Sequence, residues 1–228
     1  MKKITNQRKA TARLPAARSV FSMLAAAAIL VSSACKSTLL DERFHSNDLS
    51  RWTVIDDPET VEGPSAWRVE ADGWLHQRSN IWGRRGDFIG RWYGTMLVAG
   101  QAAWRDYRFS VRARANDNDG FGVVFRFKDA EHFYRLLFIN DGMSGGPLAR
   151  LDKRDGADYT ELWSEPRAYK QAAELEIEVE AVGNHLCGKL NRQPLFDLHD
   201  ESYQNGNAGL FCYAQSDQAF DDVRVVER

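Results

Sequence analysis

The sequence predicts an all-β fold, a jelly-roll sandwich built from two antiparallel sheets. Residues 107–114 alternate between apolar and polar side chains, and this period of two is typical of a strand with one buried face. Two strongly apolar runs follow at 121–127 and 133–139, and a strand that is apolar on both faces needs a covering layer. We therefore expect a second sheet to cover them. No stretch after residue 40 has a convincing helical period.

The remaining strands follow from alternation and turn residues taken in chain order. A hairpin is expected at 69–75, because Ala-Asp-Gly at 71–73 supplies its turn. Another hairpin is expected around residues 154–156, and Gly183-Asn184 should separate two further strands. The other expected segments are 95–99, 147–153, 158–163, 174–180, 186–190, 193–196, 209–213 and 220–226. Many short strands with tight turns indicate two sheets packed face to face.

The first 34 residues have the composition of a secretory signal peptide. They contain six basic residues and no acidic ones, followed by an apolar run from 20 to 31 and a small-residue stretch. Cys35 follows Ser-Ser-Ala, which resembles a bacterial lipobox, so we expect lipidation of Cys35; cleavage after Ala34 to release a free secreted chain is the alternative. The expected organisation is a signal peptide at 1–34, a lipid-anchor tether at 35–40 and one lectin-like jelly-roll domain at 41–228.

The charge of the exported part argues against nucleic acid as a partner. The chain has 30 basic and 32 acidic residues, and six of the basic ones lie in the signal. The mature part keeps 24 basic against 32 acidic residues, a formal charge of −8. Such an acidic domain suits calcium, neutral glycans or basic partners better than nucleic acid.

Cys187 and Cys212 are the two cysteines of the mature domain. In an oxidising compartment a disulfide between them would stabilise the fold by roughly 3 kcal/mol. The alternative is a pair of buried free thiols in neighbouring strands. A zinc site is less favoured, because no CxxC or His-x-x-x-His spacing accompanies them and the five histidines are scattered.

An ordered set of short motifs along the mature chain resembles the concanavalin A-like lectin/glucanase superfamily. Within it, the likeness is closest to thrombospondin C-terminal and laminin-G-like domains. The motifs are Phe44, 49–52 (LSRW), 63–67 (GPSAW), 77–80 (QRSN), 94–97 (GTML), 104–107 (WRDY), 117–126 (DNDGFGVVFR), 133–135 (FYR) and 220–223 (FDDV). The resemblance implies a two-sheet sandwich, but it leaves function open among lectins, adhesion modules, and polysaccharide hydrolases and lyases.

Three acidic turn residues form a candidate calcium site. Alternate turns of a meander fall at the same end of a sandwich, so Asp117, Asp119 and Asp141 should lie together. Calcium takes six to eight oxygen ligands, mostly carboxylates and carbonyls. The resemblance supports calcium, since related domains often bind it at loops. The alternative is that these residues are present because they form turns well.

The segment 81–93 combines bulky rings with glycines, arginines and an aspartate, without strand alternation. Aromatic rings stack on the C–H faces of sugars, and Arg and Asp bind hydroxyls. The predicted carbohydrate-binding residues are Trp82, Arg84, Arg85, Asp87, Trp92 and Tyr93. The alternative is that the tryptophans close the mouth of the sandwich core.

The acidic strand around Glu176, Glu178 and Glu180 resembles the catalytic strand of laminarinase-type glycoside hydrolases. In those enzymes alternate carboxylates point into a cleft. Here Glu178 replaces the central Asp, and Glu174 extends the alternation, as on a solvent-facing strand. We therefore predict no catalytic residues, with these three glutamates as the alternative.

The sequence favours an exported, lipid-anchored, non-catalytic module of the bacterial cell envelope that binds carbohydrate and holds structural calcium. The anchor would be its only contact with a membrane. Protein adhesion through a laminin-G-like surface and hydrolysis or lysis of a polysaccharide are the alternatives. An enzyme requires two carboxylates facing one cleft, roughly 5–10 Å apart. A lectin requires an accessible aromatic ring beside polar groups.

Overall fold

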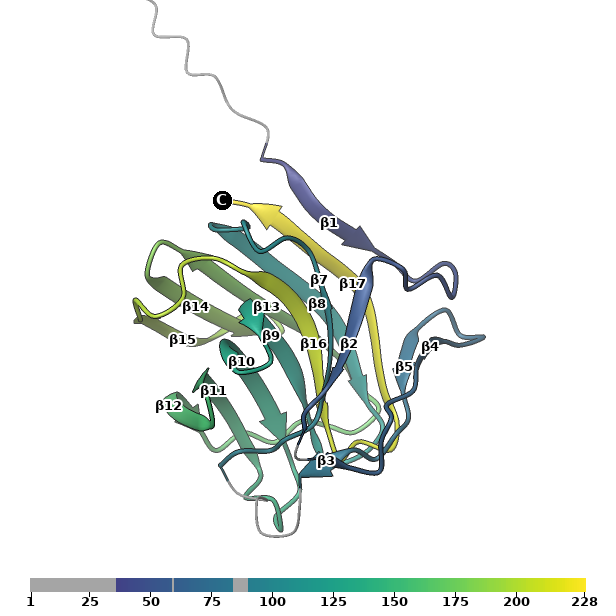
Figure 1. Ribbon diagram of the computed structural model, residues 1–228. Coiled ribbons are helices and arrows are strands. Elements are labelled where there is room, and N and C mark those ends of the chain that lie inside the picture. Colours follow the sequence, from purple (N-terminus) through teal and green to yellow (C-terminus); the bar gives the residue numbers. More distant parts are fainter. Residues whose placement is uncertain (1–35, 59, 84–89) are drawn as a thin grey trace, which may run out of the picture. The chain divides into compact units, whose positions relative to one another are not determined.

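The structure is a computed structural model, and it describes residues 36–58, 60–83 and 90–228. The expected signal peptide, Cys35, Arg84, Arg85 and Asp87 lie outside the described residues. In the described part the chain contains strands and no helix, so the all-β prediction is confirmed (Figure 1). No described helix is therefore long and apolar enough to span a membrane.

One large sheet, here called sheet A, has eight strands. Its order is β15-β14-β13-β8-β17-β5-β4, and β1 pairs with β17 beside this path. The strands are β1 (Thr38–Glu42), β4 (Trp67–Val69), β5 (Leu75–Gln77), β8 (Tyr107–Ala115), β13 (Glu174–Val182), β14 (His185–Leu190), β15 (Gln193–His199) and β17 (Gln218–Glu227).

The other large sheet, sheet B, has seven strands in the order β12-β11-β10-β9-β16-β7-β2. The strands are β2 (Trp52–Asp56), β7 (Thr95–Ala99), β9 (Gly120–Asp129), β10 (His132–Ile139), β11 (Leu148–Asp155), β12 (Asp158–Glu165) and β16 (Asn207–Tyr213). Two short strands, β3 (Thr60–Val61) and β6 (Trp82–Gly83), pair separately. All pairings are antiparallel.

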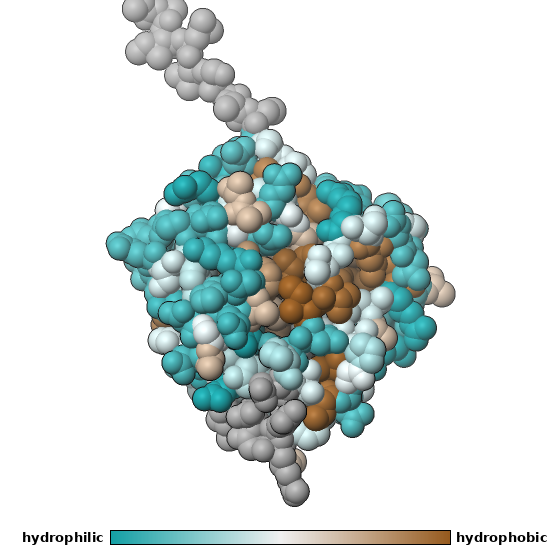
Figure 2. All heavy atoms as spheres, viewed as in Figure 1, coloured by the Kyte–Doolittle hydropathy of each residue, from teal (hydrophilic) through white to brown (hydrophobic). Residues whose placement is uncertain are grey.

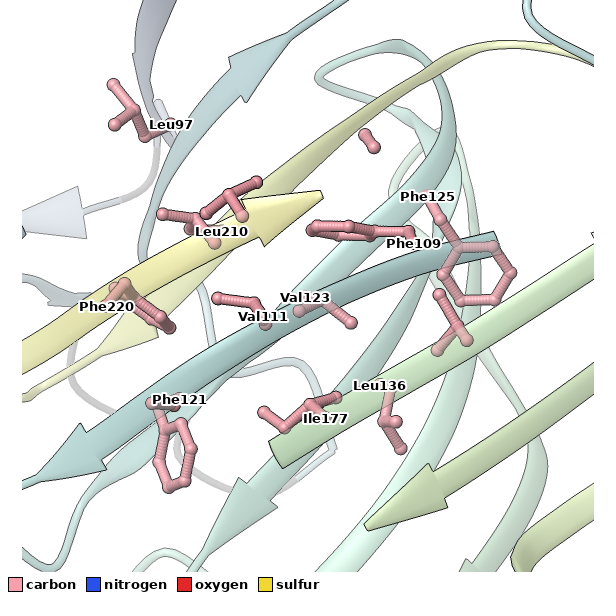
Figure 3. Close-up of a cluster of buried hydrophobic side chains, with 14 of the residues drawn as sticks. Leu97, Phe109, Val111, Phe121, Val123, Phe125, Leu136, Ile177, Leu210 and Phe220 are labelled. Carbon is pink, nitrogen blue, oxygen red and sulfur yellow. The ribbon is translucent and has the colours of Figure 1, made fainter. Parts of the chain in front are cut away.

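The core lies between the two sheets and follows the alternation that the sequence predicts. On β8 the apolar residues Phe109 and Val111 are buried, while the residues between them are half-buried on the outer face. Phe121 and Val123 of sheet B and Ile177 of sheet A meet the same cluster (Figure 3). At about 25 cal/mol per Å² of apolar area removed from water, this shared interior is the main source of stability.

The outer face of sheet B is also buried, which explains why its central strands are apolar on both faces. We expected a sheet as the covering layer. Sheet A covers the inner face only, whereas the outer face packs around Trp92, which lies in the segment before β7 and contacts a second apolar cluster. Its members include Met96, Val124, Leu137 and Phe211. The covering layer on this side is therefore loop and edge residues.

The sandwich begins inside the segment expected to be a tether. β1 starts at Thr38 and pairs with the last strand, with Thr38 opposite Val226. The amide of Glu227 donates to the carbonyl of Ser37 at 2.9 Å. Residues 38–40 therefore belong to sheet A.

The predicted disulfide is wrong. Cys187 lies on the outer face of β14 in sheet A, whereas Cys212 lies on β16 of sheet B with its side chain in the core, and both are free. Because they belong to different sheets, they are not the neighbouring buried thiols of the alternative either. Burial, followed by the charge of Asp197, raises the pKa of Cys187 to about 11.

Candidate functional site

Four loops converge at one end of the sandwich, and backbone hydrogen bonds join them. The amide of Asp141, after β10, donates to the carbonyl of Asn118, after β8, at 2.8 Å. The amide of Ala214, after β16, donates to the carbonyl of Ile81 at 2.7 Å. The prediction that Asp117, Asp119 and Asp141 share one end is therefore confirmed.

Two buried polar side chains hold the turn between β8 and β9. The hydroxyl of Tyr169 donates to the carbonyl of Asp119 at 2.6 Å and reaches that of Asp117 at 3.1 Å. The amide nitrogen of Gln215 also donates to the carbonyl of Asp119, at 2.5 Å. These hydrogen bonds join the turn between β8 and β9 to the two connections that carry Tyr169 and Gln215, at the pocket described below.

The three carboxylates at this end differ in their hydrogen bonding. Asp117 accepts hydrogen bonds from the amide and the hydroxyl of Ser216, at 3.1 and 2.6 Å. Burial opposes its ionisation, but these bonds outweigh burial and lower its pKa. Asp141 accepts bonds from the amide and hydroxyl of Ser144, at 2.9 and 2.7 Å. Both carboxylates therefore stabilise turns.

Asp119 is the exception. Its carboxylate accepts no hydrogen bond from any residue that the structure describes. Burial, followed by the charges of Asp117 and Asp141, raises the pKa of Asp119 to about 7. A half-buried carboxylate in this state can accept a hydrogen bond from a ligand or coordinate a cation.

The Asp119 side chain lines a pocket of about 260 Å³. Trp82, which is half-buried, and Tyr213, which is buried, line the same pocket. The full lining is Asn80, Trp82, Asp119, Asp141, Met143, Ser144, Tyr213 and Ala214. The pocket thus joins one residue predicted to bind carbohydrate to two residues predicted to bind calcium.

Met143 is the most exposed large hydrophobic residue in the part of the chain that the structure describes, at 87% exposure. Val54 and Val182 are the other two exposed large hydrophobics among those residues, and neither lines the pocket. On the side of the molecule drawn in Figure 2, apolar residues gather near the centre and hydrophilic residues surround them. A solvent-facing methionine at the pocket mouth adds apolar surface where a ligand could cover it.

Two of the predicted carbohydrate-binding residues are buried, so that assignment is wrong for them. Trp92 is only 1% exposed, and its indole nitrogen donates to the carbonyl of Ser144 at 2.9 Å. Tyr93 is 3% exposed and meets Tyr159 edge to face. Both rings pack on the outer face of sheet B because its strands are apolar on that side. The alternative, in which the tryptophans close the mouth of the core between the sheets, does not describe Trp92 either, because its ring belongs to the second cluster.

The predicted calcium ligands Asp117, Asp119 and Asp141 do not form a compact donor group. Among the described residues, one set of three or more His, Cys, Asp or Glu donors lies close enough to share an ion, and it is at a different place. The carboxylates of Asp117 and Asp141 are occupied by turn hydrogen bonds. Calcium at this end stays a prediction.

The glutamates of the alternative catalytic strand lie on the outer face of sheet A, and each pairs with a basic residue. Glu176 pairs with Arg192 at 3.3 Å, Glu178 with Lys189 at 2.7 Å, and Glu180 with Arg228 at 2.5 Å. Neutralised carboxylates of this kind are typical of a solvated polar face. This geometry does not favour the hydrolase alternative.

Five of the lining residues are not predicted from the sequence: Asn80, Met143, Ser144, Tyr213 and Ala214. A signal for four of them is available, because the loop at 140–147 and the end of the strand at 213, with its loop at 214–217, lie on the same side as Asp119. Alternation of turns therefore groups Met143, Ser144, Tyr213 and Ala214 with the acidic residues. Asn80 belongs to the motif at 77–80, but nothing in the sequence marks it as a ligand-binding residue.

The fold is an antiparallel two-sheet jelly-roll sandwich, and similar solved structures include one with a galectin-like fold. A carbohydrate-binding module CBM66 from Bacillus subtilis is similar, with a TM-score of 0.60 and 17% identity over 78% of this chain and 96% of that one. A galectin-like protein of unknown function from Bacillus subtilis has a TM-score of 0.60 and 9% identity over 85% and 98% of the two chains.

Domain 4 of AbnA, an extracellular arabinanase of Geobacillus stearothermophilus that was solved with arabinotriose, is also similar. Its TM-score is 0.51, with 14% identity over 84% of this chain and 93% of that one. No family model and no curated protein sequence matches the chain. At these identities the solved structures show the fold alone.

Proposed function

We propose that this protein is a non-catalytic glycan-binding module and that its ligand enters the pocket beside Trp82. The single observation that carries the proposal is a pocket lined by the half-buried Trp82 and by Asp119, whose carboxylate accepts no hydrogen bond from a described residue. A carbohydrate-binding module and an arabinanase domain bound to arabinotriose among the fold's neighbours support the same class of ligand.

The chemistry of the lining suits a sugar. The faces of sugar rings carry C–H groups that pack on an indole, and Trp82 and Met143 offer such apolar surface. Sugar hydroxyls donate hydrogen bonds, and Asp119 offers a carboxylate acceptor, while the Asn80 side chain can both donate and accept. The Asp119 carboxylate adds specificity, because hydrogen bonds to an ionised acceptor are stronger than those between neutral groups.

The size of the pocket limits the ligand. A volume of about 260 Å³ falls just below the roughly 300–1,000 Å³ of sites for drug-sized molecules. One or two sugar residues, such as the end of a chain, fit that space better than a long internal stretch.

The proposal includes export, a lipid anchor at Cys35 and structural calcium. The signal-like composition of residues 1–34 and the Ser-Ser-Ala-Cys sequence support the first two. Asp119, which lines the pocket and whose carboxylate accepts no hydrogen bond from a described residue, supports a calcium ion at the same end, with water completing the oxygen shell.

A glycan array probed with the full chain, once with calcium and once with chelator, tests the proposal. Arabinotriose is the first soluble probe for calorimetry. We expect Trp82→Ala to weaken binding of any glycan hit about 10-fold, the size of one lost aromatic stack of roughly 1–1.5 kcal/mol. Binding that survives the chelator unchanged would remove calcium from the proposal and leave the glycan site.

The matched control is Trp163→Ala. Trp163 is also half-buried, but it lies on β12, packs against Phe196 and does not line the pocket. The Trp163→Ala variant should bind the glycan as the unaltered protein does. The proposal fails if no glycan binds in either condition, which would favour protein adhesion, or if Trp82→Ala binds normally. Release of reducing sugar from a polysaccharide would instead support the hydrolase alternative.

A further inference from the structure

The strands β14 and β15 form a hairpin at the edge of sheet A (Figure 1). On its outer face lie histidine, cysteine and aspartate side chains, which are residue types that can bind a metal. His185 lies opposite His199, and Cys187 lies opposite Asp197. Residues two apart on a strand point to the same face. The two cross-strand pairs therefore place four possible metal ligands side by side.

Three of these side chains already converge. The Nε2 of His185 lies 2.6 Å from Oδ1 of Asp197 and 3.3 Å from Sγ of Cys187. Their three donor atoms all lie within 4.8 Å of one another. The ring of His199 stacks on that of His185, with centroids 4.8 Å apart and planes at 29°.

Two of these separations are close to those of a tetrahedral zinc site. Zinc–sulfur and zinc–nitrogen bonds of about 2.3 and 2.0 Å imply roughly 3.5 Å between the sulfur and nitrogen ligands. The observed separation of Sγ and Nε2 is 3.3 Å. The histidine nitrogen and the aspartate oxygen would need about 3.3 Å, so they must part by less than about 1 Å.

The inner face of the hairpin fixes this geometry. Leu186 and Phe196 are buried in the core, and the ring of Phe196 lies directly over Gly188. A Cβ at Gly188 would meet that ring at 2.1 Å, so a residue with a side chain is excluded there. The register is regular from His185 to Gly188 and shifts only beyond it. The side chains of His185, Cys187 and Asp197 are therefore held by two paired strands whose register and packing are fixed.

The carboxylate of Asp197 has His185 and Cys187 as its neighbours and no lysine or arginine as an ion-pair partner among the described residues. On the adjacent strand β13, Glu176, Glu178 and Glu180 each pair with a lysine or arginine. No lysine or arginine among the described residues pairs with Asp197, which is 74% exposed on its side chain. An incoming cation would therefore not have to displace a basic side chain.

We propose that His185, Cys187 and Asp197 bind a zinc ion through Nε2, Sγ and a carboxylate oxygen, with water as the fourth ligand. Nitrogen, sulfur and oxygen donors of this kind are the usual zinc set. The thiol gives its proton to solvent as the zinc–sulfur bond forms, and the proton between Nε2 of His185 and Asp197 leaves Nε2 for Nδ1 or for solvent. No electron transfer is involved. The ion would fasten the edge strand β15 to β14.

Cobalt(II) and zinc(II), added to the full chain carrying Cys35→Ser, test this proposal. Removing Cys35 leaves Cys187 and Cys212 as the only thiols. We expect cobalt to produce thiolate-to-metal charge-transfer absorption and the intense visible bands of four-coordinate cobalt, and zinc to abolish both. Zinc should also raise the unfolding temperature.

Substitutions of single residues test which side chains bind the metal. Cys187→Ser should remove the charge-transfer band. Asp197→Asn should keep the band and weaken zinc binding at least about 10- to 100-fold, the range already seen when only a partner of a metal ligand is lost. The second variant alters an exposed side chain, so it keeps the test valid if the first folds poorly.

The controls are Cys212→Ala and His132→Gln. Cys212 is the buried thiol, and His132 forms a similar pair with Asp129, at 2.7 Å, that lacks a cysteine. Both should bind cobalt normally. The zinc proposal fails if no charge-transfer band forms, or if the band persists in Cys187→Ser. Glycan binding can succeed or fail separately, because none of the proposed zinc ligands lines the Trp82 pocket.

Discussion

The outer faces of the two sheets use similar residues in opposite ways. On sheet A the outer face is polar, and its ion pairs, such as Glu176 with Arg192, remain in contact with water. On sheet B the outer face is covered, and Arg135 pairs with Asp152 at 2.9 Å with both side chains 0% exposed. The ring of Tyr159 lies 4.4 Å from the guanidinium of Arg135.

The difference shows that the contribution of an ion pair to stability depends more on its burial than on which residues form it. An exposed pair contributes about 0–1 kcal/mol, because water and salt screen it. Removing one partner of a buried pair leaves an uncompensated charge and costs about 3–5 kcal/mol. The same alternation of arginine and carboxylate in a strand can therefore occur on a face where substitutions cost little stability or on one where they cost much.

The largest expected effect follows from truncating the buried pair. Asp152→Ala should lower the free energy of unfolding by about 3–5 kcal/mol, because it leaves Arg135 buried without its carboxylate. Arg150, which also pairs with Asp152, loses the same partner. Denaturant-induced unfolding measures the change. A loss below about 1 kcal/mol would mean that the two faces do not differ as described.

An intermediate effect is expected at the pocket, which lies between these extremes of burial. The folded pKa of Asp119 is about 7, above the value near 3.9 of an unfolded chain. Between about pH 4 and pH 7 the folded state therefore holds the extra proton, and the free energy of unfolding falls as the pH rises.

Asp119→Asn should remove this part of the pH dependence. From about pH 4 to pH 8 the unaltered protein should lose roughly 1 kcal/mol more stability than the variant, after allowance for solvent screening. Denaturant titrations across this range measure the two slopes. Identical slopes would contradict the assignment of a raised pKa to Asp119.

The smallest effect is expected on the outer face of sheet A. Glu176→Ala removes a carboxylate that is 44% exposed and whose partner Arg192 is 86% exposed. The free energy of unfolding should change by less than about 0.5 kcal/mol. This truncation matches Asp152→Ala in kind, so the ratio of the two losses measures the contrast between the faces.

Much of the fold followed from local pattern. The alternation of 107–114 predicts one buried face, and β8 has it. The turns predicted at 71–73 and 183–184 fall between β4 and β5 and between β13 and β14. The pattern also predicts that the acidic turns share one end, because the topology of a meander decides which turns lie together, and the structure has them there.

The rest depended on contacts between distant segments. Trp92 and Trp82 share one composition-defined segment, but the apolar outer face of sheet B buries the first and leaves the second at the pocket. The fate of Cys187 and Cys212 depended on which sheet each strand joins, and strand order is not a local property. The cross-strand pairing of Cys187 with Asp197 is equally invisible without the hairpin register.

The last strand, β17, connects the two ends of the sandwich. β17 runs from Gln218, beside the loop that lines the pocket, to Glu227, beside the start of β1 (Figure 1). Ten residues of strand span roughly 30 Å. The chain therefore enters the sandwich at the pole opposite the pocket.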